Sequence, residues 1–500
     1  MTRRTAWAAA AVVFLVHAIG NAHYGFFRDE LYFIICGQHP QFGYVDQPPV
    51  VPLLAALTQL GGHSLWLLRL VPALFAAGGA YLTVLLVAEF GGGLFAQALA
   101  ALVYLFTNVL MSFGAKVGTD EVGLLTWPLL AYLILRIAKG ANPRLWLWAG
   151  AITGLSFESK YSIVFFVAAL LGGLLLTPQR RLLWNRWALG GAAIAFLIAL
   201  PNVLWQAHYG FPMWQLLEAG QHGKNIIVGP LLYLVQEILI TNLFLFPVWV
   251  IGVIWLLRRP GLRWAAYLYV ILIAEMMVLH GKHYYPANVY PIVIAAGAVP
   301  IEAWTSRLLA ARIAIVVYAL ALGPLFLPFS LPILPEPAFL AYQARLGELL
   351  HIPKGTLATE HGRETAALPG DWADMHGWPE LAAIVQRVYA SLPPNERAQA
   401  VAITSNYGEA AAIQFFAPGV PVISRHNQYW LWGPRGYSGN VLIDVNGDCG
   451  ASEHLFRYGK RVATLDVPYT IGWETGIPIM LCRGIKVPLA TLWPKIKVYE

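Results

Sequence analysis

Long apolar runs, separated by short polar segments, fill the first two thirds of the chain. A helix needs about 20 predominantly apolar residues to cross a bilayer, and most of these runs reach or approach that length. The pattern predicts eleven membrane helices, at residues 6–24, 64–88, 94–113, 122–138, two within 146–177, 187–204, 242–257, 264–279, 289–304 and 312–329. An apolar run at 230–240 predicts one more helix, lying on the membrane surface.

The pattern changes near residue 330, where the proline-rich segment LPFSLPILPEP ends the last long apolar run. No later run is long enough to span a membrane. Helical patterns over 380–392 and 409–416 alternate with strand-like runs at 400–404, 441–445, 462–467 and 477–482. We therefore predict an α-helical polytopic membrane domain at 1–330, followed by a small soluble α/β domain at 331–500.

Composition supports a membrane protein. The chain is 58% hydrophobic and 12% charged, whereas soluble domains are roughly half apolar and about a quarter charged. The net charge of +7 comes from basic doublets between apolar runs, which argues against nucleic-acid binding. The three cysteines, Cys36, Cys449 and Cys482, have no metal-binding or redox spacing and are read as ordinary small residues.

The distribution of charge predicts the orientation in the membrane, because cytoplasmic loops are enriched in lysine and arginine. One set of loops contains Arg3, Arg4, Lys139, Arg144, Arg180, Arg181, Arg186, Arg258, Arg259, Arg263, Arg307 and Arg312. The opposite loops contain Asp29, Glu30, Asp46, Asp120, Glu121, Glu158 and Glu218. We predict a multi-pass plasma-membrane (inner-membrane) protein with an uncleaved first helix, a cytoplasmic N-terminus and an extracytoplasmic C-terminal domain. The loop at 89–93 is assigned to the inside although it contains no lysine or arginine.

The first outer stretch is the strongest candidate for chemistry. Asp29 and Glu30 follow the first apolar run, and Asp46 precedes the pair Pro48–Pro49, which restricts the backbone before the next helix. Acids beside a helix end are also common in solvated loops. Three acids in so short and rigid a stretch favour a functional role.

A second acidic group lies where the fourth membrane helix begins, and it contains Lys116, Asp120 and Glu121. Thr119 or Asp120 is able to cap that helix, and acids are favoured in a first turn. Capping accounts for one acid. It does not account for the Asp–Glu pair together with a lysine, so a functional role is favoured here as well.

Two further outer segments carry cations. Glu158 and Lys160 lie between two apolar runs, where they either face a polar cavity or form an interfacial turn with a snorkelling lysine. The segment HGKHYYPANVYP contributes Lys282, His283, Tyr284 and Tyr285. An aromatic belt explains the tyrosines, whereas lysine beside histidine suits phosphate binding. A zinc site at His280 and His283 lacks an evident third ligand.

This set of residues suits a group transfer in which a carboxylate takes a proton from an acceptor hydroxyl. Cationic side chains, or a bound divalent cation such as Mg²⁺ or Mn²⁺ held by the paired acids, would stabilise a leaving phosphate. The membrane setting suggests that the phosphate belongs to a lipid.

The segments RDELYF, GYVDQPPVVPLL, GTDE, GLSFESKYS and GKHYYPANVYP together resemble the dolichyl-phosphate-mannose–protein mannosyltransferase-like superfamily. The segment NYGEAAAIQFFAPGVPVISRHNQYWLWGP is similar to the extracytoplasmic domain of its bacterial branch, glycosyltransferase family 39. The resemblance implies a GT-C fold and a transferase that takes sugar from a polyprenyl-phosphate donor on the extracytoplasmic side. The acceptor is a lipid, a glycan or a protein, and membrane lipids surround the enzyme.

The resemblance also implies roles for individual residues. Asp29 is the expected catalytic base, with Glu30 supporting it or binding acceptor. Asp120 and Glu121 match the second acidic position, on the acceptor or metal side with Asp46. The expected donor-phosphate group is Lys116, Lys160, Lys282, His283, Tyr284 and Tyr285. Some relatives that modify lipid A carry a lysine before the proline pair; Gln47 stands there in this chain, so their donor preference does not transfer directly.

Two other functions remain as alternatives. A polyprenyl-linked lipid transporter or flippase would spread its charged residues through the membrane midplane, whereas here they gather at one face. A non-catalytic membrane scaffold would use the outer domain for binding, but it would not need the two Asp–Glu pairs.

Overall fold

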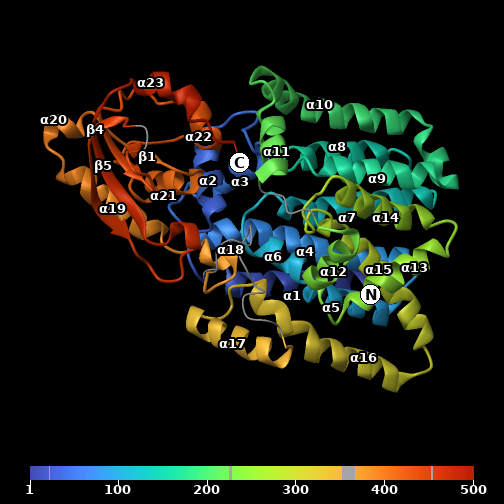
Figure 1. The fold of residues 1–500 in the computed structure, drawn as a ribbon. Helices are drawn as coiled ribbons and strands as arrows, with labels where there is room; N and C mark the ends of the chain where they lie inside the picture. The colour runs from blue at the N-terminus through green and yellow to red at the C-terminus, as the bar shows by residue number, and fades with distance from the viewer. Residues whose placement is uncertain (22, 224–227, 352–365, 452–453, 500) are drawn as a thin grey trace.

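The computed structural model describes residues 1–21, 23–223, 228–351, 366–451 and 454–499. The N-terminal part is a bundle of helices, and the C-terminal part is a mixed sheet covered by short helices (Figure 1). Helices α2 (Arg28–Gln38) and α3 (Val50–Thr58) stand between the bundle and the sheet domain. Side chains of α2 and of the sheet domain share one hydrophobic cluster, so the two parts are packed together.

A helix or helix pair lies in each apolar segment predicted to cross the membrane. These are α1 (Thr2–Gly20), α4 (Leu65–Glu89), α5 (Leu94–Leu105) with α6 (Asn108–Ala115), α7 (Glu121–Ala138), α8 (Leu145–Phe157), α9 (Ile163–Leu175), α10 (Arg186–His208), α13 (Phe246–Leu257), α14 (Arg263–Val278), α15 (Tyr290–Trp304) and α16 (Leu309–Leu322). The additional helix predicted at 230–240 is α12 (Pro230–Thr241). Among the described residues, five spans are long and apolar enough to cross a membrane, or seven if each bent pair counts as one.

Two helix pairs are bent. α5 and α6, which lie within one predicted span, meet at 61°, and α12, which was predicted as a separate surface helix, meets α13 at 116°. Non-helical backbone at membrane depth must find its hydrogen-bond partners within the protein. Asn242, at the break after α12, donates from Nδ2 to the carbonyl oxygens of Phe106 and Gly323, each at 3.0 Å. A side chain at one break therefore satisfies a carbonyl group at the other.

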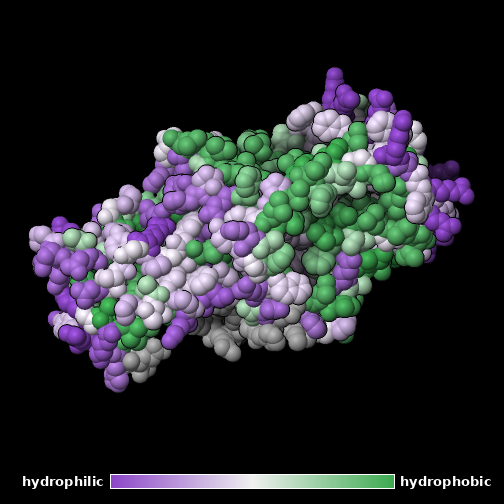
Figure 2. All heavy atoms as spheres, turned by 90° about the horizontal axis from the view of Figure 1, so that it is seen from above, coloured by the Kyte–Doolittle hydropathy of each residue, from purple (hydrophilic) through white to green (hydrophobic). Residues whose placement is uncertain are grey.

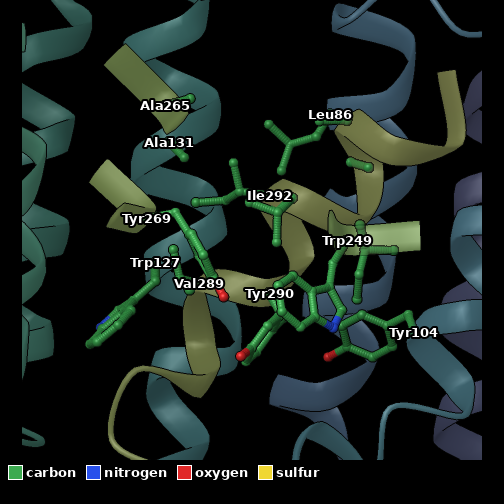
Figure 3. Packing of buried hydrophobic residues seen from close by; sticks show 14 of the residues in the cluster. Leu86, Tyr104, Trp127, Ala131, Trp249, Ala265, Tyr269, Val289, Tyr290 and Ile292 are labelled. Carbon is green, nitrogen blue, oxygen red and sulfur yellow. The ribbon is translucent and has the colours of Figure 1, made fainter. Parts of the chain in front are cut away.

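Large aromatic side chains fill the centre of the bundle (Figure 3). The rings of Trp249 and Tyr290 lie 5.5 Å apart and those of Tyr269 and Tyr290 lie 6.0 Å apart. Elsewhere the helices touch through glycine: a Cβ atom on Gly252 of α13 would overlap the carbonyl oxygen of Val293 in α15. Close backbone packing of this kind holds helices together in lipid. Lipid tails are as apolar as the helix surfaces, so no hydrophobic force drives the helices to associate.

The surface agrees with a membrane setting. Figure 2 shows a broad hydrophobic band over the bundle with hydrophilic residues at both of its ends. Apolar side chains of α10 and α16 are largely uncovered, and Leu197 and Val317 are 63% and 59% exposed. An apolar face of this extent suits contact with lipid tails rather than with water.

The C-terminal sheet has the strand order β2-β1-β3-β5-β4. β1 pairs in parallel with β2 and β3, and β5 pairs antiparallel with β3 and β4. The strands are β1 (Ala400–Thr404), β2 (Val422–Ser424), β3 (Val441–Val445), β4 (Phe456–Leu465) and β5 (Ile477–Ile485). The other helices are α11 (Pro212–Gly223), α17 (Glu336–Leu349), α18 (Gly370–Ala373), α19 (Trp378–Ser391), α20 (Pro394–Arg397), α21 (Tyr407–Phe416), α22 (Asn427–Trp432) and α23 (Leu489–Leu492).

Most of the predicted elements of this domain are present. The runs at 400–404 and 441–445 coincide with β1 and β3. The three-residue strand β2 was not predicted, because it is too short to give a periodic signal. β4 begins at Phe456 rather than at 462, since its exposed edge carries polar and basic residues that hide the strand pattern.

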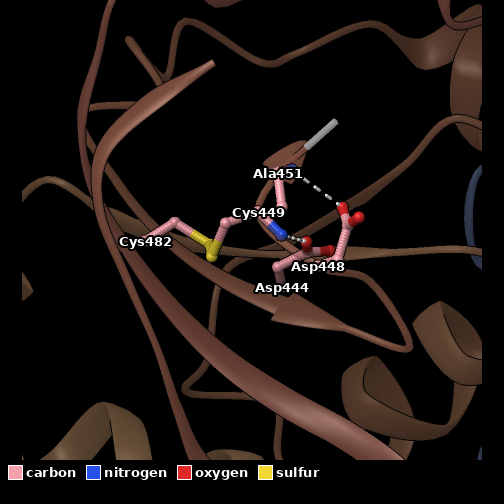
Figure 4. Close-up of a disulfide and its surroundings, with 5 residues drawn as sticks. All are labelled: Asp444, Asp448, Cys449, Ala451 and Cys482. Carbon is pink, nitrogen blue, oxygen red and sulfur yellow. Dashed lines mark hydrogen bonds between the residues drawn. A yellow bond between two sulfur atoms is a disulfide. The ribbon is translucent and has the colours of Figure 1, made fainter. Parts of the chain in front are cut away.

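A disulfide corrects the interpretation of two cysteines. Cys449 and Cys482 are bonded to each other and tie the loop after β3 to β5 (Figure 4). The carboxylate of Asp444 accepts a hydrogen bond from the backbone nitrogen of Cys449 at 2.9 Å. The pairing escapes sequence analysis because 33 residues separate the two cysteines and no spacing motif marks them. Cys36 is free and buried.

Candidate active site

A cavity of about 960 Å³ lies between the bundle and the sheet domain. Part of its wall is charged and comes from α2, the loop after α6 and the segment around α18. Another part is apolar and includes Val109, Phe113, Val164, Phe165, Val203, Leu217 and Ile240. Such a cavity can hold a charged group and an apolar chain at the same time.

Asp29 stands in the first turn of α2 and lines this cavity. The backbone nitrogen of Phe27 donates to Glu30 Oε2 at 2.8 Å, which fixes the start of the helix. The Tyr407 hydroxyl, from the sheet domain, donates to Asp29 Oδ1 at 2.8 Å. Arg28 Nε lies 3.5 Å from the same oxygen. The oxygen Oδ1 of Asp29 is therefore held by two neighbours, and the Asp29 side chain is 29% exposed.

Glu30 has a different environment from its neighbour. It is fully buried, does not line the cavity, and forms an ion pair with the buried guanidinium of Arg69 at 2.9 Å. Its Oε1 also accepts from the backbone nitrogen of Val117 at 3.0 Å. Arg69 in turn donates to the carbonyl oxygens of Asn21, His23 and Gly25. The pair thus fastens the segment before α2, and the start of α2, to α4.

Arg69 was missed as a site residue. The sequence does contain a signal, because an arginine inside the apolar run LWLLRLVPALF needs a buried partner. The signal does not say which of the several outer acids is that partner.

Asp46 lines the cavity from the loop between α2 and α3. Its Oδ1 accepts from the Tyr32 hydroxyl at 3.0 Å, and its Oδ2 accepts from Asn427 Nδ2 at 3.1 Å. Burial raises the pKa of the Asp46 carboxyl to about 7; the hydrogen bond from Tyr32 limits the rise, and the charge of Asp29 adds to it. The neighbouring Gln47 is buried and does not line the cavity.

This raised pKa predicts a pH-dependent stability. An unfolded aspartate titrates at about pH 4, so the stability that Asp46 contributes is complete below that pH and is lost as the pH rises through about 7. The melting temperature of the wild type, relative to that of Asp46→Asn, is expected to fall across this interval. Thermal unfolding of both proteins in detergent at several pH values measures the difference. Parallel curves would show that Asp46 does not hold its proton in the folded state.

The cations of the cavity are paired with acids. Lys160 Nζ lies 2.6 Å from Asp120 Oδ2, and Lys116 forms an ion pair with Asp371 of α18. Arg28 Nε lies 3.4 Å from Asp374 Oδ2, as well as near Asp29. Glu121 lines the cavity and accepts from the backbone nitrogen of Gly118 at 3.2 Å.

The loop after α14 supplies the aromatic part of the wall. Lys160 Nζ lies 5.0 Å from the ring centre of Tyr285 and 5.9 Å from that of Tyr284. His283 also lines the cavity, and burial, aided by Lys282, lowers the pKa of its imidazole. Lys282 itself is outside the cavity lining, with Nζ at 5.8 Å from the Tyr284 ring centre.

The fold therefore gathers nearly all of the predicted site residues around one cavity. Glu30 and Lys282 are the two that do not line it. Asp371, Asp374, Tyr407 and Asn427 were not predicted, because they belong to the C-terminal domain and approach the acids only in three dimensions.

Among the residues that the structure describes, the cavity acids do not form a cluster with metal-ligand spacing. Within the described parts of the chain, the one group of three side chains with metal-ligand spacing is Asp444 with Cys449 and Cys482, and these two cysteines form the disulfide. Asp120 and Lys160 instead neutralise each other. In this arrangement the lysines are the charges placed to face a leaving phosphate, rather than the divalent cation considered as an alternative to them.

Residues 46–205 match the family model described as dolichyl-phosphate-mannose-protein mannosyltransferase. This part of the chain is therefore similar to that mannosyltransferase family. The matched segment includes Asp46, Lys116, Asp120 and Lys160, and Asp29 lies shortly before it.

Two similar proteins extend this result. Lipid A galacturonosyltransferase RgtD from Rhizobium johnstonii is 28% identical over 188 residues. That match covers 37% of this chain and 39% of RgtD, so the chain aligns with about two fifths of its relative's length. Crystal structures of ArnT from Cupriavidus metallidurans, apo and bound to undecaprenyl phosphate, match with TM-scores of 0.63 and 0.58 at 14% identity. Both matches cover 95% of this chain and 96% of ArnT, which shows that the chain shares the ArnT fold.

Proposed function

We propose that this protein is a membrane glycosyltransferase that moves a sugar from a polyprenyl-phosphate donor to an acceptor hydroxyl on the extracytoplasmic side. The observation that carries the proposal is the cavity, where carboxylates, lysines and an apolar wall meet at the end of the bundle next to the C-terminal domain. A lipid phosphate suits the lysines and the apolar wall, and a sugar acceptor suits the carboxylates. The mannosyltransferase family match, the RgtD similarity and the ArnT fold with its undecaprenyl phosphate complex support this reading.

Asp29 is the proposed general base. Its Oδ2, the oxygen that does not bond Tyr407, would take the proton of the acceptor hydroxyl while the hydroxyl oxygen bonds the anomeric carbon. The bond between that carbon and the phosphate oxygen breaks, and polyprenyl phosphate leaves with the electron pair. The proton on Asp29 then passes to water.

Lys116 and Lys160 are the proposed phosphate ligands. Each already pairs with an acid, Asp371 and Asp120 respectively, so donor phosphate would share or replace these carboxylates. His283, Tyr284 and Tyr285 would contact the donor beside Lys160, with Lys282 behind Tyr284. We assign Asp46, Asp120 and Glu121 to the acceptor side and Glu30 to positioning Asp29.

The proposed arrangement has eleven membrane crossings, a membrane domain at 1–330 and an extracytoplasmic domain at 331–500. The N-terminus lies in the cytoplasm of a cell whose inner membrane holds the protein. The disulfide Cys449–Cys482 supports this orientation, because such bonds persist in oxidising compartments outside the cytoplasm.

Single exposed cysteines test the orientation. Lys460→Cys on β4 is expected to react with a membrane-impermeant maleimide in right-side-out vesicles, and Arg258→Cys is expected to react only in inside-out vesicles. Both native residues are exposed on the protein surface, which makes them a matched pair. The reverse pattern of labelling would place the sheet domain in the cytoplasm.

Sugar transfer in proteoliposomes tests the function itself. Purified protein would receive radiolabelled polyprenyl-phosphate donors carrying a neutral hexose, a uronic acid or an amino sugar, with native membrane extract as acceptor. Label moving to the acceptor, with release of polyprenyl phosphate, supports the proposal and identifies the sugar. If the label stays on the lipid but crosses the bilayer, the protein is a transporter and the proposed enzyme function is wrong. If the label is neither transferred nor moved across the bilayer, the result would favour a non-catalytic scaffold.

A further inference from the structure

We infer that the C-terminal domain completes the active site through Tyr407 and Asn427, two positioning residues that hold the carboxylates of Asp29 and Asp46. The contacts are present in the fold, and their catalytic meaning rests on the proposed transferase function. Each acid of the first outer loop receives one hydrogen bond from the sheet domain, although 378 and 381 residues separate the partners.

The local sequence SNYGEA places Tyr407 at the first position of α21. Asn406 caps the helix and accepts from the backbone nitrogen of Glu409 at 3.0 Å, while Glu409 Oε2 accepts from the backbone nitrogen of Asn406 at 3.2 Å. Asn406 Nδ2 donates to the buried Glu474 at 2.9 Å. The capping box is thereby tied to the segment before β5, and the backbone that carries Tyr407 is held at its start.

The ring of Tyr407 is also held from both sides. Its centre lies 4.4 Å from the ring of Tyr32 in α2 and 4.9 Å from that of His426. The guanidinium carbon of Arg28 lies 5.4 Å from it. With the ring fixed, the hydroxyl can point at Asp29 Oδ1 and leave Oδ2 for an acceptor hydroxyl. A base oriented before substrate arrives needs less rearrangement in the transition state.

A glycine allows this close approach. A Cβ atom on Gly408 would overlap Cγ of Arg28, the residue that precedes Asp29. The side chain of Arg28 is confined at this point by Tyr407 and by its ion pairs with Asp29 and Asp374. α21 and the start of α2 therefore pack against each other at Arg28, the residue beside the proposed base.

Asn427 performs the same task for Asp46. It begins α22 with a φ of 45°, a left-handed conformation that asparagine tolerates. Its backbone nitrogen donates to the carbonyl oxygen of Val498 at 2.9 Å, and its Nδ2 donates to Asp46 Oδ2 at 3.1 Å. The next residue, Gln428, accepts from the backbone nitrogen of Val45 at 3.0 Å. The loop that carries Asp46 is thus fixed at two adjacent residues by α22.

Tyr407→Phe tests the inference, because it removes only the hydroxyl. We expect kcat for sugar transfer to fall by about tenfold to a hundredfold, with KM for the lipid donor unchanged, since a misplaced base slows the reaction without weakening donor binding. Asn427→Gly keeps the left-handed backbone and is expected to lower kcat by a smaller factor. The matched control is Tyr429→Phe: Tyr429 is buried in the same aromatic layer, but its hydroxyl donates to Gln414. It should retain wild-type kcat.

A double-mutant cycle of melting temperatures makes the test independent of activity. Tyr407→Phe should lower the melting temperature less in an Asp29→Ala background than in the wild type, because the hydrogen bond is already lost there. Additive shifts would overturn the inference whether or not the protein transfers sugar. Equal kcat values for Tyr407→Phe and Tyr429→Phe in an active enzyme would overturn the positioning role. A wild type that transfers no sugar would refute the proposed function instead.

Discussion

Replacing Asp29 with asparagine is expected to lower the rate of sugar transfer by a factor of about 10²–10⁴, the usual contribution of a general base. Asparagine has nearly the same shape, and its carbonyl oxygen still accepts the hydrogen bond of Tyr407 and faces Arg28. It cannot take a proton at the position of Oδ2. The loss should therefore appear in kcat, while the fold and the binding of the donor are kept.

The measurement is the initial rate in proteoliposomes, with the melting temperature recorded for each variant. Asp466→Asn is a suitable control, because this acid is exposed on the sheet domain and does not line the cavity. Full activity in Asp29→Asn would leave the reaction class in place and exclude Asp29 as the base. Asp46 would then be the next candidate, since it lines the same cavity and already carries a raised pKa.

Removing Arg69 is expected to destabilise the fold strongly. Arg69→Met would leave the carboxylate of Glu30 buried without its cation, and such a loss typically costs about 3–5 kcal/mol of unfolding free energy. Three backbone carbonyl groups, of Asn21, His23 and Gly25, would lose their donor at the same time. Thermal unfolding in nanodiscs, followed by tryptophan fluorescence, measures the effect.

A double variant separates the charge from the packing. Glu30→Gln with Arg69→Met removes both charges. The backbone nitrogens of Phe27 and Val117 donate to different oxygens of Glu30, so the single glutamine oxygen can keep one of these two hydrogen bonds. The double variant should therefore be more stable than Arg69→Met alone. Arg258→Met, at an exposed arginine, should change stability by less than about 0.5 kcal/mol. Equal losses in the single and double variants would show that the buried charge is not the cause.

The same pair of acids shows how far sequence reasoning reaches. Asp29 and Glu30 are adjacent and both were expected near the chemistry. In the helix they point in different directions, so that one lines the cavity and the other is buried against α4. Their difference depends on Arg69 and Tyr407, one from a membrane helix and one from the sheet domain, and no local pattern connects these residues.

The helical segments, the change to an α/β domain and the gathering of acids at helix ends could all be predicted from the amino-acid sequence. These features follow from local hydrophobicity and charge, which act over a few turns of helix or one strand. The bends between α5 and α6 and between α12 and α13, the disulfide, and the partners of each acid became known from the three-dimensional structure. Those features depend on contacts between residues far apart in the chain, such as Tyr407 with Asp29, and such contacts exist only once the two parts of the protein have packed together.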